Sequence, residues 1–129
     1  KRNVAGSDNK FSFHWHGTGK DIYLFEAPID MLSFISMYPT EWRNSSYAAA
    51  CSVADNVLFQ CLEDNKHIEQ VYICFDNDNA GQTAAQRLSD KLFIKGIKSE
   101  ILVPTLKDWN EDLLFSKQEV DKKWMVQLS

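Results

Sequence analysis

The chain has 129 residues, the usual length of one domain, and its 44% of hydrophobic residues are enough to build a core. Its 14 basic and 18 acidic residues give a formal net charge of -4, which argues against strong, self-sufficient binding of nucleic acid but does not exclude contact through metal ions. No apolar run approaches the roughly 20 residues of a membrane span, and we expect neither a signal peptide nor a membrane partner. The three cysteines form no CxxC pair and lie among apolar residues, so we expect reduced thiols in a cytoplasmic protein.

Strand and helix patterns alternate along the chain. Residues 1–20 are polar and loop-like, although 11–15 alternates apolar and polar side chains and is a candidate for a short strand. Beyond them the pattern predicts strands at 22–25, 47–51, 71–75 and 99–103, with helices at 29–38, 53–62 and 80–93 between them. Pro28 suits a first helical turn and Gly96 ends the third helix. A short helix is predicted at 108–115, and we expect the charged tail, 116–129, to be helical.

This alternation predicts an α/β fold with about four strands, mainly parallel, flanked by helices. The strand at 71–75 has no polar side, which is typical of a parallel strand covered on both faces. We divide the chain into an N-terminal extension (1–20), a main domain (21–115) and a C-terminal tail (116–129). Working sites of such sheets lie at the carboxyl ends of the strands, so polar side chains that directly follow a strand are the candidates for chemistry.

Asp76 and Asp78 directly follow the third predicted strand, in the segment VYICFDNDNAG. Residues two apart in extended backbone point to the same side, so the two carboxylates could converge on one hard cation such as Mg²⁺. The alternative is a polar turn in which an Asp caps the following helix. The residues alone leave both interpretations open.

Glu26 directly follows the first predicted strand. If the first and third strands are neighbours, Glu26 faces the Asp pair, and a carboxyl group near two others has a raised proton affinity that suits a general acid or base. Asp30 lies one helical turn later and can point back toward Glu26. The alternatives are a solvated strand end for Glu26 and a first-turn acid favoured by the helix dipole for Asp30.

A third acidic cluster, LKDWNEDL, follows the fourth predicted strand. It contains Asp108, Glu111 and Asp112, and Asp108 can equally cap the helix that begins there. Trp109 and Trp124 are candidates for stacking on bases, although packing is the commoner fate of tryptophan.

These three clusters together resemble a Toprim domain, the module shared by bacterial-type DNA primases, topoisomerases, OLD-type nucleases and RecR-like repair proteins. The segment FEAPIDMLSF is similar to the primase-type EGxxDxxxL at Glu26 and Asp30, with Ala-Pro in place of the glycine-containing step. The segment FDNDNAGQTAA closely resembles DxDxAGxxA, with Asp76 and Asp78 at the acidic positions. The segment KDWNEDL is similar to the acidic segment after the fourth strand, and the resemblance covers about residues 20–115.

The resemblance implies a compact sheet of four parallel strands with Mg²⁺ or Mn²⁺ at Asp76 and Asp78, and Glu26 as general acid/base or additional metal ligand. Three further acids are expected to support the site or hold a second metal: Asp30, Asp108 and Asp112. We expect a metal-dependent nucleotidyltransferase domain of a primase-like protein from a mobile element or phage, inactive when isolated. Its partners would be DNA or RNA, nucleoside triphosphates and other domains of a larger protein.

Two alternatives share the same residues: a Toprim nuclease, in which water replaces the 3′-hydroxyl, and a Toprim-fold module that binds without turnover. A receiver-like domain would place its acidic pair after the first strand, whereas here the pair follows the third.

Overall fold

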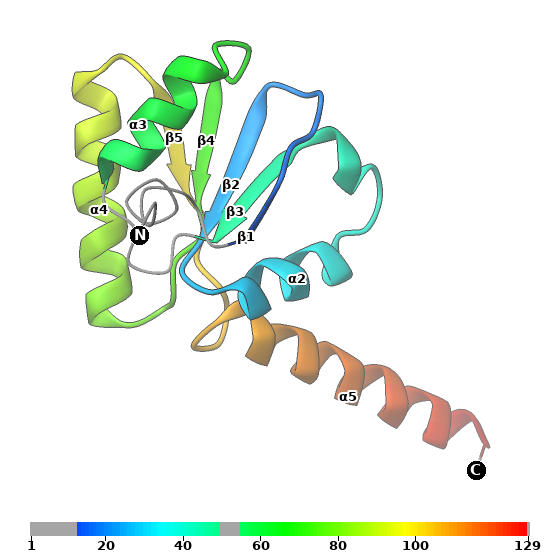
Figure 1. Ribbon diagram of the computed structural model, residues 1–129. Helices are drawn as coiled ribbons and strands as arrows, with labels where there is room; N and C mark the ends of the chain where they lie inside the picture. The colour runs from blue at the N-terminus through cyan, green and yellow to red at the C-terminus, as the bar shows by residue number, and fades with distance from the viewer. Residues whose placement is uncertain (1–12, 50–54, 129) are drawn as a thin grey trace, which may run out of the picture.

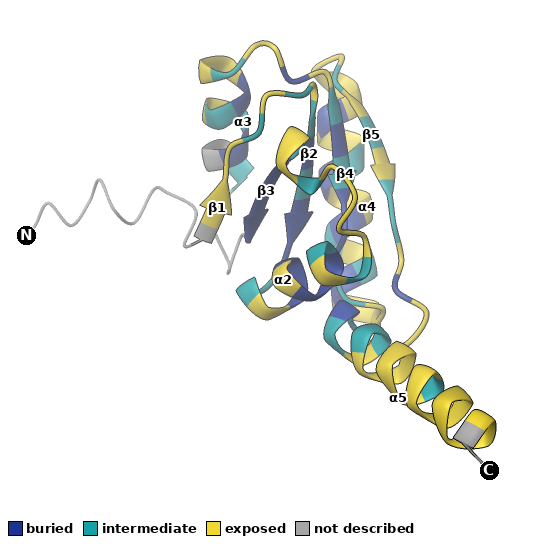
Figure 2. Ribbon diagram, turned by 90° about the vertical axis from the view of Figure 1, so that its right-hand side faces the viewer, coloured by how far each residue is buried: buried dark blue, intermediate teal, exposed yellow. Residues whose placement is uncertain are grey.

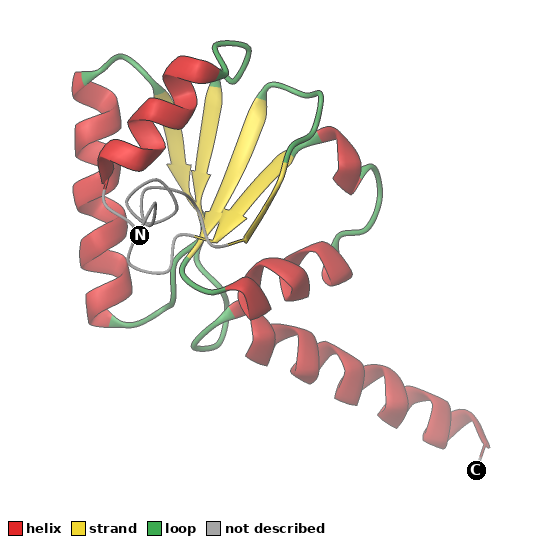
Figure 3. Ribbon diagram, in the orientation of Figure 1, coloured by secondary structure: helices red, strands yellow, loops and turns green. Residues whose placement is uncertain are grey.

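A central sheet with helices on both sides organises the chain (Figure 1, Figure 3). The computed structural model describes residues 13–49 and 55–128. In chain order the elements are β1 (Phe13–Trp15), β2 (Asp21–Phe25), α2 (Pro28–Met37), the 3-10 helix η1 (Trp42–Asn44), β3 (Ser46–Ala49), α3 (Asp55–Asp64), β4 (Gln70–Ile73), α4 (Asn79–Ile94), β5 (Lys98–Ile101) and α5 (Trp109–Leu128).

The sheet has the strand order β1-β3-β2-β4-β5, and β2 to β5 are all parallel. This confirms the predicted α/β class, with five strands where about four were predicted. The additional strand is the short edge strand β1, which pairs antiparallel with β3 within the segment predicted as a candidate strand. Residues 11, 12, 50 and 51, which the strand predictions included, lie outside the described residues.

The two faces of the sheet carry two separate apolar clusters. Along β2, Ile22 and Leu24 point to one face while Tyr23 and Phe25 point to the other, as the two-residue period of a strand requires. The first face is covered by α3 and α4, and the second is covered by α2 and α5. Phe25 is fully buried on the second face, and burying a side chain of this size stabilises a fold by about 1.5–3 kcal/mol.

Tyrosines form a row across the second face. Tyr23 lies in register with Tyr47 on β3 and with Tyr72 on β4. Their rings stack with centroids 5.3 Å and 4.5 Å apart. This row extends the packing of α2 across three neighbouring strands.

The helix ends follow the predicted local chemistry. Pro28 occupies the first turn of α2, where its missing N–H costs nothing. Gly96, with φ of 76°, follows α4 in the left-handed region that favours glycine. The predicted second helix begins at residues 53 and 54, which lie outside the described residues, and α3 is described from Asp55 onward.

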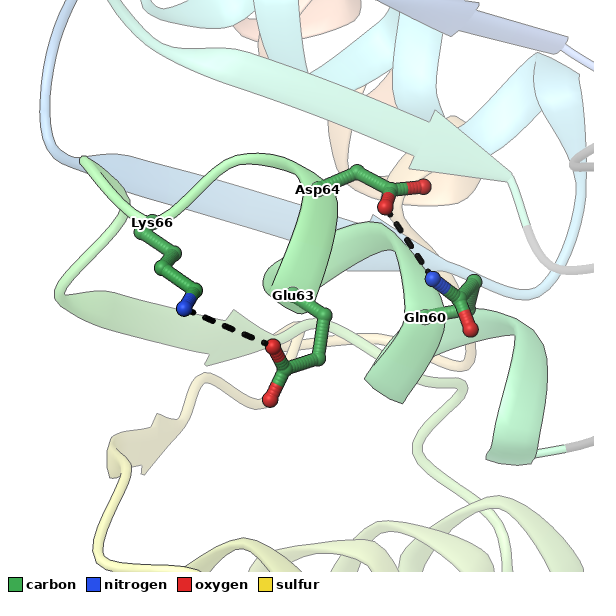
Figure 4. Close-up of polar contacts among 4 residues, drawn as sticks. All are labelled: Gln60, Glu63, Asp64 and Lys66. Atoms are coloured by element: carbon green, nitrogen blue, oxygen red, sulfur yellow. Dashed lines mark hydrogen bonds and ion pairs between the residues drawn. The ribbon is translucent and has the colours of Figure 1, made fainter.

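The solvent face of α3 is held by polar side-chain pairs (Figure 4). Gln60 donates to Asp64 across one helical turn at 3.0 Å, and Lys66 lies 3.8 Å from Glu63. Exposed pairs of this kind contribute only a few tenths of a kcal/mol. The stability of α3 therefore comes mainly from Leu58 and Leu62, which are buried against the sheet.

Helix α5 is a single helix of 20 residues that continues without a break past residue 115. It packs against α2, and its C-terminal half projects from the body with mostly exposed residues (Figure 2). Among the described helices, none combines the length and the apolar character that crossing a membrane requires.

Candidate active site

The carboxyl ends of β2 and β4 lie side by side and bring Glu26 next to Asp76. Leu24 is in register with Ile73, and one residue further the N–H of Cys74 donates to the carbonyl of Leu24 at 2.8 Å. The backbone N–H of Asp76 then donates to Oε1 of Glu26 at 3.3 Å. The sheet order therefore brings together two acidic residues that are 50 residues apart in the sequence.

Asp76 holds a buried carboxylate oxygen without a donor. Its Oδ1 is buried and has no hydrogen-bond partner, and it is the one such side-chain atom among the described residues. Burial raises the pKa of the Asp76 carboxyl, the charges of Asp108 and Asp78 raise it further, and Lys107 lowers it. Buried polar atoms are normally paired because leaving one unpaired costs about 1–3 kcal/mol, so this oxygen is suited to an additional positive partner.

Asp78 caps helix α4. Its backbone is extended, with φ of -140°, and its Oδ1 accepts from the N–H of Gly81 at 2.7 Å. One oxygen is therefore committed to the cap, while Oδ2 is not used in that bond. The charge of Asp78 still acts on Glu26 and Asp76.

Gly81 allows the start of α4 to approach the two carboxyl groups. A Cβ built at this position would overlap the carbonyl oxygen of Asp76 and would lie 2.9 Å from Oε1 of Glu26. Since real Cβ atoms do not come this close, glycine is required sterically at this point.

Glu26 interacts electrostatically with three other acids of the cluster. Burial raises the pKa of its carboxyl, and the charge of Asp76 raises it next. The hydrogen bond from the backbone of Asp76 lowers this pKa, while Asp78 and Asp30 add smaller increases. Mutual repulsion among these acids favours either a retained proton or a bound cation.

Asp30 and Asp108 link the cluster to α5. Asp30 is only 4% exposed, and its Oδ1 accepts from the backbone N–H of Asn110 at 3.2 Å. Burial raises its pKa from 3.8 to about 6, with Asp108 and Asp76 adding to the rise and the hydrogen bonds from α5 opposing it. Asp108 caps α5 by accepting from the N–H of Glu111 at 2.8 Å.

Asp112 holds the loop between β5 and α5. Its two carboxylate oxygens accept from the backbone N–H groups of Thr105 and Leu106 at 2.8 Å and 2.7 Å. Both oxygens of Asp112 therefore have a hydrogen-bond donor, unlike Oδ1 of Asp76.

Asn77 connects this loop to the loop that carries Asp76. Its backbone N–H donates to the carbonyl of Lys107 at 2.6 Å, and its side-chain Nδ2 donates to the carbonyl of Pro104 at 3.1 Å. Asn77 is not among the residues that the sequence motifs indicated. Its connecting role depends on β4 and β5 being neighbours, which no local sequence signal reveals.

Trp109 is buried and its indole Nε1 donates to the carbonyl of Cys74 at 3.1 Å. Packing is therefore its role in this structure, and base stacking is not open to its ring. Trp124, in contrast, is 61% exposed.

The acids do not form a complete metal cage. Within 13–49 and 55–128, no three His, Cys, Asp or Glu side chains are grouped so that they could hold a metal by themselves. Mg²⁺ is usually held by only one or two carboxylates, with water and phosphate oxygens completing its octahedron. The unpartnered Oδ1 of Asp76 and the free oxygen of Asp78 fit a cation of this kind.

Comparison with known proteins agrees with this fold. A family model described as Toprim-like matches residues 23–113, so the chain belongs to the Toprim-like family. This confirms the family that the sequence motifs indicated. A curated relative, the uncharacterized protein MG010 of Mycoplasma genitalium, is 32% identical over 97 residues, which are 74% of this chain and 42% of that protein.

Three similar solved structures contain primase domains. The primase fragment of the bacteriophage T7 primase-helicase protein is 28% identical with a TM-score of 0.60, over 89% of this chain and 45% of that one. T7 primase domains bound to an RNA/DNA hybrid and dTTP, in a complex with the lagging-strand DNA polymerase, give 26% identity and a TM-score of 0.59, over 88% of this chain and 55% of that one. The Aquifex aeolicus primase, at 24% identity and a TM-score of 0.53 over 80% of this chain and 25% of that one, shows the same fold.

This chain is therefore a primase-like Toprim domain. It spans less than half the length of the curated relative and of the T7 primase fragment.

Proposed function

We propose that this domain catalyses metal-dependent nucleotidyl transfer on nucleic acid, as part of a primase-like protein of a phage or other mobile element. The observation that carries the proposal is the buried, unpartnered Oδ1 of Asp76, which lies beside Glu26 at the carboxyl edge of the sheet. Similarity to the T7 primase fragment over 89% of the chain supports both the reaction class and the phage-type origin.

Asp76 and Asp78 are the residues that would hold Mg²⁺ or Mn²⁺. Asp76 offers an oxygen that no protein donor uses, and Asp78 offers the oxygen that is not used for capping α4. When bound, the cation would supply positive charge that stabilises a phosphate in transfer.

Glu26 is suited to hold and release a proton. Its Oε1 accepts from the backbone of Asp76, which leaves Oε2 as the atom that carries the proton. Its pKa is raised by burial and by Asp76, and this brings the proton closer to the pH at which a general acid or base works best. A neighbouring cation would lower this pKa and would convert Glu26 into a base or an additional ligand.

Asp108 is the better candidate for a supporting acid than Asp112. Only one oxygen of Asp108 has a capping partner, and its charge reaches both Asp76 and Asp30. Asp112 uses both oxygens on the adjacent loop. Asp30 supports the site by linking α2 to the first turn of α5. Its hydrogen-bond partner there, Asn110, is two residues from Asp108.

The partners of this site would be a DNA or RNA strand and nucleoside triphosphates. The chain carries a formal net charge of -4, so phosphate binding by the domain itself would depend on the cation. Other domains of a longer protein would supply the basic surface.

Two readouts on the chain test this proposal. The first readout is binding of a fluorescent nucleoside triphosphate to this chain, which we expect to depend on Mg²⁺ or Mn²⁺. The second is metal-dependent extension of a labelled strand on a template, which we expect when the longer protein supplies the basic surface. Asp76→Asn should abolish both, whereas Asp90→Asn, an exposed acid on α4, should change neither. Shortened strands without extension would indicate the nuclease alternative. Absence of both metal-dependent binding and turnover would indicate a module without catalytic activity.

A further inference from the structure

The C-terminal half of α5 presents an unpartnered apolar stripe to solvent. Val120 is 53% exposed and Trp124 is 61% exposed, and residues four apart lie on the same side of a helix. Leu113 lies further toward the body on the same side of α5, and the exposed Lys117 places a charged group between Leu113 and Val120. A half-helix of this length is marginal in water without tertiary packing, and contiguous exposed apolar groups mark an interaction surface.

A hollow lies directly beside the stripe, where the end of α2 meets the middle of α5. It has a volume of about 490 Å³, and its apolar lining includes Met37, Tyr38, Leu113 and Val120. The same surface therefore carries both an exposed indole and a hollow that could receive one.

The charges on this surface are balanced and self-complementary. Lys117 and Asp121 both line the hollow, four residues apart on α5. Such a pair offers no excess positive charge to a phosphate backbone or an anionic membrane. It does match an inverted copy of itself, because a two-fold axis places the lysine of one copy opposite the aspartate of the other.

We propose that α5 pairs antiparallel with α5 of a second copy of this chain, with Trp124 of each copy entering the hollow of the other. The two-fold axis crosses the helix pair at the level of residues 119 and 120. Lys117 of each copy then faces Asp121 of the second copy, and Trp124 reaches the level of Leu113 and Leu114 of the second copy. The pairing uses none of the acidic-site residues, so it stands or falls independently of the proposed catalysis.

Sedimentation of the full chain between about 1 and 200 µM tests the pairing. We expect a reversible monomer–dimer equilibrium for the natural sequence. Trp124→Glu should weaken it at least about 30-fold, the effect of losing an interfacial hot spot. Val126→Glu is the matched control, because Val126 is 74% exposed but lies roughly 200° around the helix from Trp124. This control should leave the dissociation constant unchanged.

A charge exchange tests the register. Lys117→Glu and Asp121→Lys should each weaken dimerisation by about 5-fold, and the double variant should restore it. Circular dichroism of every variant checks that α5 remains helical. The proposal is overturned if the natural chain is monomeric throughout, whether or not another partner covers the stripe. It is also overturned if Trp124→Glu and Val126→Glu weaken the dimer equally, or if the double variant fails to restore it.

Discussion

Asp30→Asn should change the stability of the domain in opposite directions at low and high pH. Asp30 is buried at the junction of α2 and α5, and its pKa in the folded chain is about 6 against an ordinary value of 3.8. The folded state therefore binds the proton more tightly than the unfolded state does. The contribution of the protonated Asp30 carboxyl to stability is fully present below about pH 4 and is lost as the pH rises through about 6.

The magnitude follows from this difference in pKa. A rise from 3.8 to about 6 corresponds to about 3 kcal/mol of unfolding free energy, because each pKa unit is worth 1.36 kcal/mol. Asparagine removes this ionisation cost and keeps an oxygen that accepts from the N–H of Asn110. It lacks the second acceptor oxygen, and this loss lowers the unfolding free energy by about 1 kcal/mol. The variant should therefore be more stable than the natural chain by about 2 kcal/mol at pH 8 and less stable by about 0.5 kcal/mol at pH 4.

Urea unfolding followed by circular dichroism between about pH 4 and 8 measures both values. Asp90→Asn serves as the control, because Asp90 is an exposed residue of α4, and its difference from the natural chain should stay near zero across the range. The reasoning is refuted if the Asp30→Asn difference is independent of pH, or if the natural chain gains stability relative to the variant as the pH rises.

Two further variants test the construction of the site. Gly81→Ala should destabilise the domain by about 1–3 kcal/mol in thermal or urea unfolding, because the added methyl overlaps the backbone of Asp76 and crowds Glu26. A variant as stable as the natural chain would contradict the steric argument. Asp112→Ala should lose about 1–3 kcal/mol, because two backbone N–H groups lose their acceptor, while metal binding measured on the folded variant should be retained. A loss of metal affinity in Asp112→Ala without a loss of stability would instead make Asp112 a ligand.

Much of the fold follows from local patterns. The buried run at 71–75 and the alternation of strand and helix are consequences of residue periodicity, and they predict the parallel sheet. Once β2 and β4 are neighbours, Glu26 and Asp76 necessarily meet at their carboxyl ends. The edge strand β1 is described at Phe13–Trp15, and the short alternation at 11–15 alone left it a candidate.

The detailed roles of the acids could not be predicted in the same way. Asp76, Asp78 and Asp112 are chemically identical, and only the loop conformations decide which oxygens find a backbone N–H. Asp112 finds two, Asp78 finds one, and Oδ1 of Asp76 finds none. The hydrogen bond from Asn77 to Pro104 likewise spans two loops that are distant in the sequence.

Calorimetric titration of Mg²⁺ and Mn²⁺ tests the central claim, that the cluster around Asp76 binds a divalent cation. We predict saturable binding that Asp76→Asn abolishes and Asp90→Asn leaves intact. The affinity should increase as the pH rises through the pKa values of Glu26 and Asp76, because the cation competes with protons on these two carboxyl groups and burial raises the pKa of both. Equal binding by Asp76→Asn would contradict the account. So would the absence of binding at millimolar metal in the presence of an oligonucleotide and a nucleoside triphosphate.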